Sequence, residues 1–467
     1  MNPVAIIGGG ITGLTAAYRL TRNHVPVMVY EAGGRVGGPM QSIREEGYLS
    51  EFGPNTILET SPKIGALIDD LGLKERRWES NPAMNRNYIV RGGRMRALPQ
   101  SPVSFAFSPL LSAAAKVRIA REFFLRNQAE DEDESLADFV RRRFGQEFLD
   151  YAINPFVTGV YAGTSEELSV QYAFPKLKAL EKKYGSVIRG AILGARERRK
   201  SGEVPRTQAK KISFDEGLQV LVDALETELR EAVRLDTGVT GLRCEEGEWV
   251  VTSRSRTGEE THRHSAVLLT APAHKIAEMK MEGVDFSILG EMAHPPVARV
   301  ALGFRREDVA DPLRGFGFLV PKAEGMKILG TTFSSSIFAN RAPEGHVLLT
   351  TFVGGCRQPE LALEPEEKLM ELVVEDLRRV LGVRGVPTYR HCWLFRRAIP
   401  QYNVGHKKFV DFMNGMEKRF AGLYFAGSFR DGISAGNCIV SGHDVAGRIA
   451  QFLAVGTPDH LSQTVTS

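Results

Sequence analysis

The stretch that decides the fold is Val4-Ala-Ile-Ile-Gly8-Gly-Gly10-Ile-Thr-Gly13-Leu-Thr-Ala-Ala-Tyr-Arg-Leu20, close to the amino-terminal end of the chain. Its first four residues are apolar and predict a buried parallel strand, and the residues after Gly13 predict a helix. Between them, Gly8 permits a sharp turn, Gly10 lets the backbone approach a pyrophosphate, and Gly13 lets helix and strand lie close together. The phosphates would meet the amides at the helix N-terminus. The stretch therefore predicts a dinucleotide-binding strand, turn and helix.

Glu31 and the residues that follow it indicate which dinucleotide would bind. A second predicted strand, 27–30, ends in Glu31, where a carboxylate can accept hydrogen bonds from both ribose hydroxyls. Arg35 and the pair Gly37-Gly38 come too soon after this acid for the helix of an ordinary nicotinamide enzyme, and they place a cation and a flexible backbone beside the pyrophosphate. These residues favour FAD as the cofactor. The alternative, a glycine-rich turn in an unrelated α/β protein, does not account for the second strand and its acid.

Length and composition bound the class of protein. The chain of 467 residues is longer than one hydrophobic core usually serves, so we expect two or three domains. Its 43% hydrophobic and 25% charged residues are typical of a soluble globular protein. Because 60 basic residues are balanced by 56 acidic ones, the formal net charge is only +4, which argues against extensive nucleic-acid binding.

The cysteines and the apolar segments bear on the compartment. The four cysteines include no CxxC pair and no close histidine, so we expect neither a metal site nor a disulfide framework, as in a reducing cytoplasm. We expect no signal peptide, because the first residues lead directly into a strand. No apolar run reaches the length of a spanning helix, so any membrane association would be peripheral, on the cytoplasmic face of the cell membrane.

Residues 100–126 carry an amphipathic pattern. We expect an apolar loop at 103–111 and a helix from Ser112 onward. The helix has an apolar stripe of Ala113, Val117, Ala120 and Phe124, flanked by Lys116, Arg118, Arg121 and Arg126. Such a stripe fits a helix lying on an anionic bilayer, and it fits equally a core helix with solvated basic edges. Periodicity leaves both interpretations open.

The remaining elements follow from caps, breakers and apolar runs. Before residue 100 we expect a helix capped by Ser61, with Pro62 in its first turn and Gly72 as terminator, and a hairpin around Gly92-Gly93. Between 130 and 153 we expect an acidic solvated connector (130–134), a helix from the capping box Ser135-x-x-Asp138 to about Gly145, and a further helix to about Ile153. Residues 155–163 interrupt the helical pattern. After them we expect a basic helix (180–199) and a mobile loop (200–211). Beyond it we expect a helix after Gly217, strands from Val233 to Trp249, a buried strand at 266–272, a mixed or antiparallel sheet within 273–398, a strand at 423–427 and a last helix from about 432 to 452.

Several motifs carry a resemblance to a known family. The stretch Glu31-Ala-x-x-Arg35-x-Gly37-Gly38, together with Gly47-Tyr-Leu-Ser-Glu51-Phe-Gly53-Pro54-Asn55, resembles the flavin amine-oxidase and protoporphyrinogen-oxidase superfamily. Over nearly its whole length the chain resembles the protoporphyrinogen-oxidase family. The carriers are Gly159-Val-Tyr-Ala-Gly163, Phe214-x-x-Gly-Leu-Gln, Phe318-Leu-Val-Pro321, Thr350-Thr-Phe-Val-Gly-Gly355 and Ile399-Pro-Gln-Tyr-x-x-Gly-His406.

The resemblance implies an α/β fold with three parts. They are a discontinuous Rossmann-like FAD-binding domain, a mixed-sheet α+β substrate domain, and an α-helical membrane-associating insertion. The expected bounds are 1–84, 213–272 and 399–456 for the FAD-binding domain, 85–92 and 273–398 for the substrate domain with a linker at 196–212, 93–195 for the insertion, and 457–467 for a disordered tail.

The resemblance also implies an activity and partners. Protoporphyrinogen IX would be oxidised to protoporphyrin IX in three two-electron steps, each moving a hydride from a meso carbon to flavin N5, with O2 reoxidising the flavin to give H2O2. Aromatisation favours hydride loss, so the protein has to position an apolar disc and compensate its carboxylates, and we name no catalytic base. The expected partners are the porphyrinogen and O2, a peripheral membrane surface, a second copy in a homodimer and a chelatase that receives the product.

Residue roles follow from the resemblance position by position. The cofactor contacts are Gly8, Gly9, Gly10, Ile11, Thr12, Gly13, Glu31, Ala32, Arg35, Gly53, Pro54, Asn55, Thr56 and Val239, with Ile433, Ser434 and Ala435 at the isoalloxazine and Phe395 as an aromatic wall. The substrate contacts are Arg91 for a propionate, Gly159 as a carbonyl acceptor for pyrrole N–H groups, and Leu319, Thr332 and Phe352 as walls. Thr332 departs from the Leu or Ile expected opposite Leu319, and Asp215-Glu216 replaces an expected glycine.

Other interpretations remain open at this point. Arg91 fits a surface arginine in a hairpin, Val239 fits an ordinary strand valine, and Tyr402 and His406 fit either a chemical or a structural role near the flavin. The rival functions are an amine oxidase, a carotenoid-type desaturase, a coproporphyrinogen III oxidase that forms coproporphyrin III, and a non-catalytic flavin-bound tetrapyrrole carrier. Turnover of porphyrinogens against amines would separate them.

Overall fold

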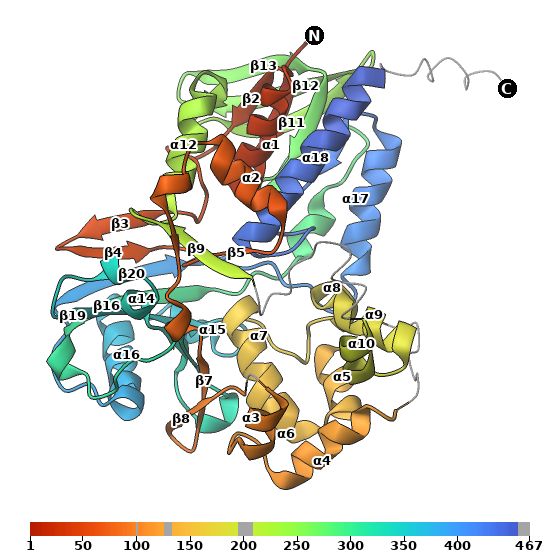
Figure 1. Cartoon of the computed structure of the whole chain (residues 1–467). Helices are drawn as coiled ribbons and strands as arrows, with labels where there is room; N and C mark the ends of the chain where they lie inside the picture. Colours follow the sequence, from red (N-terminus) through yellow and green to blue (C-terminus); the bar gives the residue numbers. More distant parts are fainter. Residues whose placement is uncertain (100, 126–132, 195–208, 456–467) are drawn as a thin grey trace.

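A parallel sheet built from distant segments forms one pole of the molecule (Figure 1). The computed structural model describes residues 1–99, 101–125, 133–194 and 209–455. The sheet has the order β10-β2-β1-β14-β21, and β1 pairs in parallel with both β2 and β14. The strands are β1 Val4–Ile7, β2 Val27–Tyr30, β10 Val233–Arg234, β14 Ala266–Leu269 and β21 Leu423–Phe425. The predicted strands at both ends of the chain are confirmed.

Alternating side chains of β1 divide the core around this sheet. Val4 and Ile6 lie in the cluster with the helices α1 (Ile11–Arg22), α2 (Pro62–Asp70), α12 (Gln219–Leu229) and α18 (Ala435–Val455). Ala5 and Ile7 lie in the cluster on the other face. That face is covered by α13 (Ala273–Ile276), α17 (Lys407–Arg419) and a second sheet of order β13-β12-β11-β15, whose strands are β11 Gly238–Glu245, β12 Glu248–Ser255, β13 Gly258–His264 and β15 Lys280–Met281.

A mixed seven-stranded sheet forms the second region, as expected for 273–398. Its order is β20-β16-β19-β18-β17-β7-β8, with all pairs antiparallel except β17 with β7. One face packs on α16 (Glu366–Leu381). The strands are β7 Asn87–Arg91, β8 Arg94–Ala97, β16 Val297–Arg305, β17 Gly317–Leu319, β18 Ile328–Thr332, β19 His346–Gly354 and β20 Tyr389–Phe395. Since β8 belongs to this sheet, the boundary expected at residue 92 divides a hairpin.

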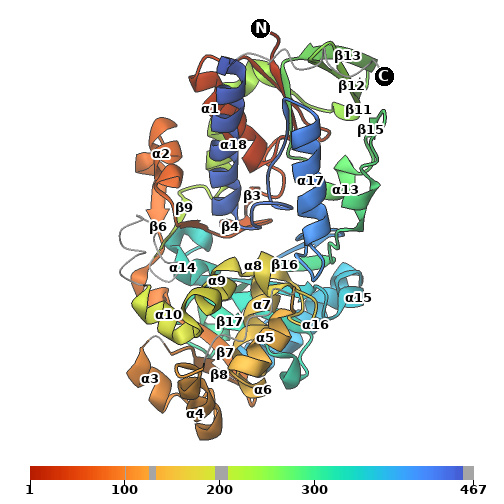
Figure 2. The same ribbon diagram turned by 90° about the vertical axis from the view of Figure 1, so that its right-hand side faces the viewer.

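Short helices form the third region, at the end of the molecule remote from the parallel sheet in both views (Figures 1 and 2). They are α3 Pro102–Phe107, α4 Ala113–Glu122, α5 Leu136–Arg143, α6 Gln146–Phe148, a π-helical turn Leu149–Ile153, α7 Asn154–Tyr161, α8 Val170–Ala173, α9 Pro175–Tyr184 and α10 Val187–Leu193. No helix among the described residues is long and apolar enough to cross a membrane.

Two predictions in this region are wrong, each at a proline that lies in the first turn of a helix. Residues 102–107 form a helix rather than a loop, since Pro102 occupies its first turn and Ser101 and Ser104 form a reciprocal capping box. Residues 154–161 continue the helical path through Pro155, because the π-helical turn before it lets the proline take the first turn of α7.

Three further predictions need correction. The basic helix expected at 180–199 is broken at Gly185, whose φ of +75° ends α9 in the left-handed region. Glu134 at the end of the acidic run is not solvated, because it pairs with Arg142 at 2.6 Å and Lys178 at 2.8 Å. The last residues of the expected mobile loop belong to β9 (Lys210–Phe214), which pairs with β5 (Ile57–Glu59) and β6 (Arg77–Glu79). Residues 126–132, 195–208 and 456–467 lie outside the described residues.

A buried ion network holds the short helices together. The carboxylate of Glu181 is 0% exposed and pairs with Arg142 at 2.5 Å and with Arg143. Arg143 also lies 3.1 Å from Glu122, which accepts hydrogen bonds from the first amides of α10. Burial raises the pKa of Glu181, but hydrogen bonds and charge from the two arginines outweigh it, so the pKa lies below its ordinary value of 4.5.

Replacing Glu181 is expected to unfold this region more easily. Glu181→Gln leaves Arg142 and Arg143 under-compensated, and we expect a loss of about 3–5 kcal/mol in the free energy of unfolding at pH 7. Because the folded pKa is lowered, the wild-type stabilisation is present above the ordinary glutamate pKa and is lost as pH falls below it. Urea unfolding at pH 7 and pH 4 measures both effects. The control is exposed Glu166→Gln, 3.6 Å from Arg141, for which less than about 1 kcal/mol is expected; an equal loss in both variants contradicts the role of the network.

Candidate functional site

The loop between β1 and α1 has the steric properties that the glycine pattern predicts. Gly8 has φ of +113°, and a Cβ there would lie 2.6 Å from the backbone nitrogen of Ala271. A Cβ on Gly13 would lie 2.1 Å from the carbonyl oxygen of Gly8. A Cβ on Gly10 would meet no atom within 4 Å, so the loop leaves open space at the N-terminus of α1. An anionic pyrophosphate fits there, next to the helix amides.

Glu31 and Arg35 lie on either side of this loop. The carboxylate of Glu31 accepts hydrogen bonds from the amides of Gly9 at 2.9 Å and Gly33 at 2.8 Å. The guanidinium of Arg35 donates to the carbonyls of Val36 and Gly38, and burial lowers its pKa while the charge of Glu31 raises it. These contacts fix the two side chains beside the loop without using all of their hydrogen-bonding groups.

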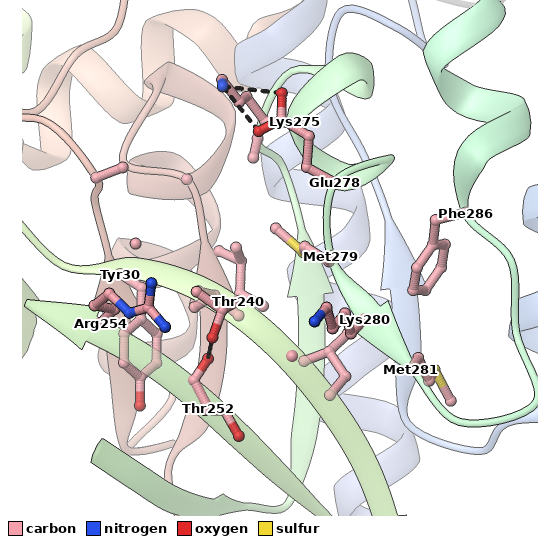
Figure 3. Close-up of a pocket in the computed structure, with 18 of the residues that line it drawn as sticks. Tyr30, Thr240, Thr252, Arg254, Lys275, Glu278, Met279, Lys280, Met281 and Phe286 are labelled. Carbon is pink, nitrogen blue, oxygen red and sulfur yellow. Dashed lines mark hydrogen bonds and ion pairs between the residues drawn. The ribbon is translucent and has the colours of Figure 1, made fainter. Parts of the chain in front are cut away.

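A cavity of about 1350 Å³ brings the predicted adenosine contacts together (Figure 3). Gly8, Glu31, Ala32 and Val239 all line it, although they come from three separate parts of the chain. Val239 adjoins a β-bulge in β11, where the register with β12 shifts before Gly241. The cavity extends past the predicted contacts toward Lys280, Met281 and Phe286, on the opposite side from Tyr30 in Figure 3.

The predicted isoalloxazine contacts lie at the start of α18. Ser434 caps this helix, because its hydroxyl accepts from the amide of Asn437 at 3.1 Å and its carbonyl accepts from Cys438. Ile433 is half-buried, and it packs against the same hydrophobic cluster as Leu319 of β17. The helix N-terminus between Ile433 and Ala435 can stabilise negative charge on a reduced flavin ring. The open loop, the cavity and this helix end fit an FAD.

One face of the seven-stranded sheet carries the predicted substrate walls. Phe352 of β19 and Leu319 of β17 both pair in register with Gly330 of the intervening β18, so their side chains share a face. Phe395 of β20 pairs with Val297 of β16, two positions along the same face. Leu319, Phe352 and Phe395 are all half-buried. None of them lines the cavity at the adenosine end.

Gly159 and Thr332 take different places on this face. A Cβ on Gly159 would lie 2.4 Å from Cδ2 of Leu319, so α7 lies directly against β17 at a glycine. Gly159 is in the last turn of α7, where carbonyl oxygens lack the amide four residues on. Thr332 pairs with Gly317 rather than with Leu319, and it lies with Asn55, Thr56 and Glu51 around a cavity of about 10 Å³.

Arg91 is already engaged by other groups. Its guanidinium lies 2.9 Å from Glu147, donates to the carbonyl of Leu110 and stacks 4.2 Å from the ring centre of Tyr151. Burial raises the pKa of Glu147, but hydrogen bonds from Ser112 and Arg91 outweigh it and the pKa is lowered. Its role toward a propionate stays a prediction, because any second carboxylate there would compete with Glu147.

Tyr402 and His406 are placed for a structural role. The hydroxyl of Tyr402 donates to the carbonyl of Ser428 at 2.6 Å and accepts from the amide of Gly432 at 2.9 Å, so it holds the loop that leads into α18. Burial raises the pKa of Tyr402 well above its ordinary value. His406 is 1% exposed, and neither ring nitrogen has a partner among the described residues. Burial lowers the pKa of His406 to about 4, so it is neutral at pH 7.

Sequence reasoning missed the charged residues behind the site. Glu51, Arg299 and Arg341 are all buried, and Arg341 lies 3.5 Å from Glu51. The sequence does indicate one of them: Arg299 is the charged residue inside the otherwise apolar run 297–302 of a predicted core strand. Such a residue is seldom buried without a specific partner.

The Tyr402 hydroxyl gives a test of how the loop before α18 is held. Tyr402→Phe leaves the carbonyl of Ser428 and the amide of Gly432 without their partner, and we expect about 1–3 kcal/mol lower stability and faster loss of bound FAD. Thermal unfolding and flavin release on dilution measure the two effects. Tyr172→Phe is the control, because the hydroxyl of Tyr172 makes no hydrogen bond with described residues while its ring also contacts His406. Equal behaviour of the two variants would refute the assignment.

Comparison with known proteins gives three kinds of likeness. The chain is 38% identical to a mitochondrial protoporphyrinogen oxidase of Nicotiana tabacum, with 96% of this chain and 95% of that protein covered. It is 31% identical to a coproporphyrinogen III oxidase of Bacillus subtilis (strain 168), with 94% and 96% covered. A crystal structure from Exiguobacterium sp. 255-15, described provisionally as a protoporphyrinogen oxidase, superposes with a TM-score of 0.80 at 26% identity over 96% of this chain and 99% of that one.

The family assignment rests on nearly the whole length of the chain. The model of the flavin-containing amine oxidoreductases matches residues 11–450, from the start of α1 into the last turns of α18. The match covers the whole seven-stranded sheet and every strand of the parallel sheet except β1. The fold is accordingly the mixed α/β fold of this family, and FAD is the cofactor. The chain belongs to the family of flavin-containing amine oxidoreductases.

Proposed function

We propose that this protein oxidises a porphyrinogen to the porphyrin, with protoporphyrinogen IX as the substrate and O2 as the electron acceptor. The observation that carries the proposal is the sheet face on which Leu319 and Phe352 lie half-buried, with Leu319 and Ile433, just before α18, packed against one hydrophobic cluster. The likeness to relatives named as porphyrinogen oxidases over nearly the full chain supports it.

The residues of the site have the properties that a flat apolar substrate requires. Leu319 and Phe352 offer apolar walls that exclude water, and Gly159 lets α7 approach them without a side chain between. When bound, FAD supplies the two-electron oxidant that takes a hydride from the substrate and transfers the electrons to O2. Six hydrogen atoms leave the macrocycle in three such rounds, and three O2 become three H2O2. We assign no protein base, since aromatisation itself favours the loss of hydrogen.

The charge of the site favours a substrate with few carboxylates. Coproporphyrinogen III carries more propionates than protoporphyrinogen IX. Arg91 is the cation assigned to a propionate, and it is already paired with Glu147. Each additional carboxylate that enters an apolar slot without a partner costs free energy. This argument supports protoporphyrinogen IX, whereas the Bacillus subtilis relative keeps coproporphyrinogen III as the second candidate.

Anaerobic mixing tests the proposal. Purified yellow holoprotein is mixed with protoporphyrinogen IX, coproporphyrinogen III or a primary amine, and flavin absorbance is followed; porphyrin fluorescence and H2O2 are measured after air is admitted. We expect rapid bleaching with a porphyrinogen, fastest with protoporphyrinogen IX, and none with the amine. Flavin that stays oxidised with both porphyrinogens overturns the proposal. Bleaching by the amine alone supports an amine oxidase, and the absence of H2O2 with every substrate supports a non-catalytic carrier.

We further propose that the tip formed by α3 and α4 lies on a cytoplasmic membrane surface. The apolar stripe predicted for α4 is exposed, with Val117 54% and Phe124 78% accessible, while Ala115 and Ile119 face the core. Phe107 on α3 is 84% exposed. Cations at Lys116, Arg118 and Arg121 flank the stripe. An exposed apolar patch bordered by cations suits an anionic bilayer better than water.

Vesicle binding tests this placement. The double variant Phe107→Ser, Phe124→Ser removes two exposed rings, each contributing about 1.5–3 kcal/mol when buried, so we expect at least roughly tenfold weaker co-sedimentation with phosphatidylglycerol vesicles. Wild-type binding is expected to fall with added salt and to be weak on phosphatidylcholine. The control is Val386→Ser, which alters an exposed valine (76%) in the other region. Unchanged binding of the double variant contradicts the membrane proposal.

A further inference from the structure

Arg299 is a buried cation on the substrate-side sheet without an acidic partner. It lies on β16 in register with Phe352 and Trp393, on the same face as the predicted substrate walls, and it is 4% exposed. Among the residues that the structure describes, no carboxylate lies within ion-pair distance of it, and its Nε has no hydrogen-bond partner. An unpaired guanidinium in the interior is costly, so its burial requires a compensating group.

The nearby charges do not compensate it. The charge of Glu51 raises the pKa of Arg299, against the effect of burial. This carboxylate, however, already accepts from the hydroxyl of Ser42 at 2.5 Å and from the amide of Leu218, and it lies 3.5 Å from Arg341. One carboxylate therefore balances two buried arginines. The region retains an excess positive charge in a low-dielectric interior, where its field is weakly screened.

Among the described residues, Arg299 makes a hydrogen bond to the segment predicted to contact FAD. Its Nη2 donates to Oδ1 of Asn55 at 2.8 Å. Asn55 belongs to the Gly53–Thr56 segment, which is predicted to contact FAD. The backbone of this segment lies close to that of Pro39, since a Cβ on Gly53 would lie 2.3 Å from the carbonyl oxygen of Pro39. With Oδ1 occupied, the Asn55 amide is oriented, and its Nδ2 donates to no described residue. The amide nitrogen is thus left free to donate to a bound group.

We propose that Arg299 is a positioning residue for the flavin: it orients Asn55 as a hydrogen-bond donor toward the ring and places a fixed positive charge behind it. Reduction by hydride adds negative charge to the ring, so both effects stabilise the reduced form relative to the oxidised one. The buried cation is compensated when the ring carries this charge. This inference rests on the proposed function, because it takes the Gly53–Thr56 segment to contact the cofactor.

The reduction potential of the bound FAD provides the main test. Arg299→Met removes the charge and the donor at similar volume, and we expect the equilibrium for flavin reduction to shift at least roughly tenfold toward the oxidised form. That change corresponds to about 30 mV lower potential for a two-electron couple. Arg299→Lys keeps the charge and is expected to recover most of the shift. Dye-equilibration titration of each holoprotein measures the potential, and the flavin content of the purified protein reports FAD retention.

A matched control separates this role from a general loss of stability. Arg357 is a half-buried arginine that follows β19 of the same sheet, and its guanidinium donates to the backbone carbonyls of Val320, Met326 and Ile328. Burial lowers the pKa of Arg357 to about 10, as it does for Arg299. We expect Arg357→Met to lower the unfolding temperature with no change of the potential.

A second variant tests the path through Asn55. Asn55→Ala is expected to shift the potential in the same direction as Arg299→Met, and the double variant is expected to shift it by less than the sum of the two. The potential of Asn55→Ala alone can be measured even if Arg299→Met binds FAD weakly, because Asn55 is only half-buried and its replacement opens no large cavity.

The outcomes distinguish the inference from the proposed function. A potential unchanged in Arg299→Met, or a shift equal to that of Arg357→Met, overturns the role of Arg299 even if porphyrinogen is turned over. If the shift of the potential in the double variant equals the sum of the two single shifts, Arg299 does not act through Asn55. Failure of the wild-type protein to oxidise any porphyrinogen overturns the proposed function, while the potentials of the variants still decide the inference.

Discussion

The close contact between α1 and α18 is the constraint on which the site depends. A Cβ on Gly442 of α18 would lie 2.4 Å from the carbonyl oxygen of Thr12, and a Cβ on Gly13 would lie 2.1 Å from that of Gly8. Glycine at these two positions lets β1, α1 and α18 lie against one another, side by side in both views (Figures 1 and 2). Segments more than 400 residues apart thereby present two helix N-termini to one cofactor, one suited to phosphate and the other to the ring.

A second constraint joins the nucleotide-binding region to the mixed sheet. The carboxylate of Glu51 on β4 (Tyr48–Glu51) meets Ser42 of β3 (Ser42–Glu45), the amide of Leu218 and the guanidinium of Arg341. Burial raises the pKa of Glu51, against the opposing effect of Arg341. Buried polar groups with this many partners specify one arrangement of the elements that carry them, because every other arrangement leaves some of them unpaired. Through Arg341, which precedes β19, this network ties β4 to the seven-stranded sheet.

Local sequence patterns succeeded where a single segment decides its own conformation. The strand, turn and helix after Val4 and the cap at Ser61 with its terminator Gly72 formed as predicted. Ser135 caps its helix by accepting from the amide of Asp138, and its hydroxyl donates to the Asp138 carboxylate. Local patterns failed where context decides. Pro155 ended no helix, because the π-helical turn before it placed the proline in a first turn. For α4 the periodicity had left two orientations open, and the apolar stripe is turned outward because Ala115 and Ile119 on its other side fill the core.

By itself, the sequence determined the class of fold and the kind of cofactor. Glycine spacing and strand periodicity are local properties, set by backbone sterics and by the alternation of side chains within one element. Only the tertiary structure decided which side chains meet: Arg91 with Glu147, Tyr402 with the loop before α18, and Arg299 with Asn55. These contacts join residues distant in the chain, and their existence depends on registers and helix orientations that the burial of the whole core selects.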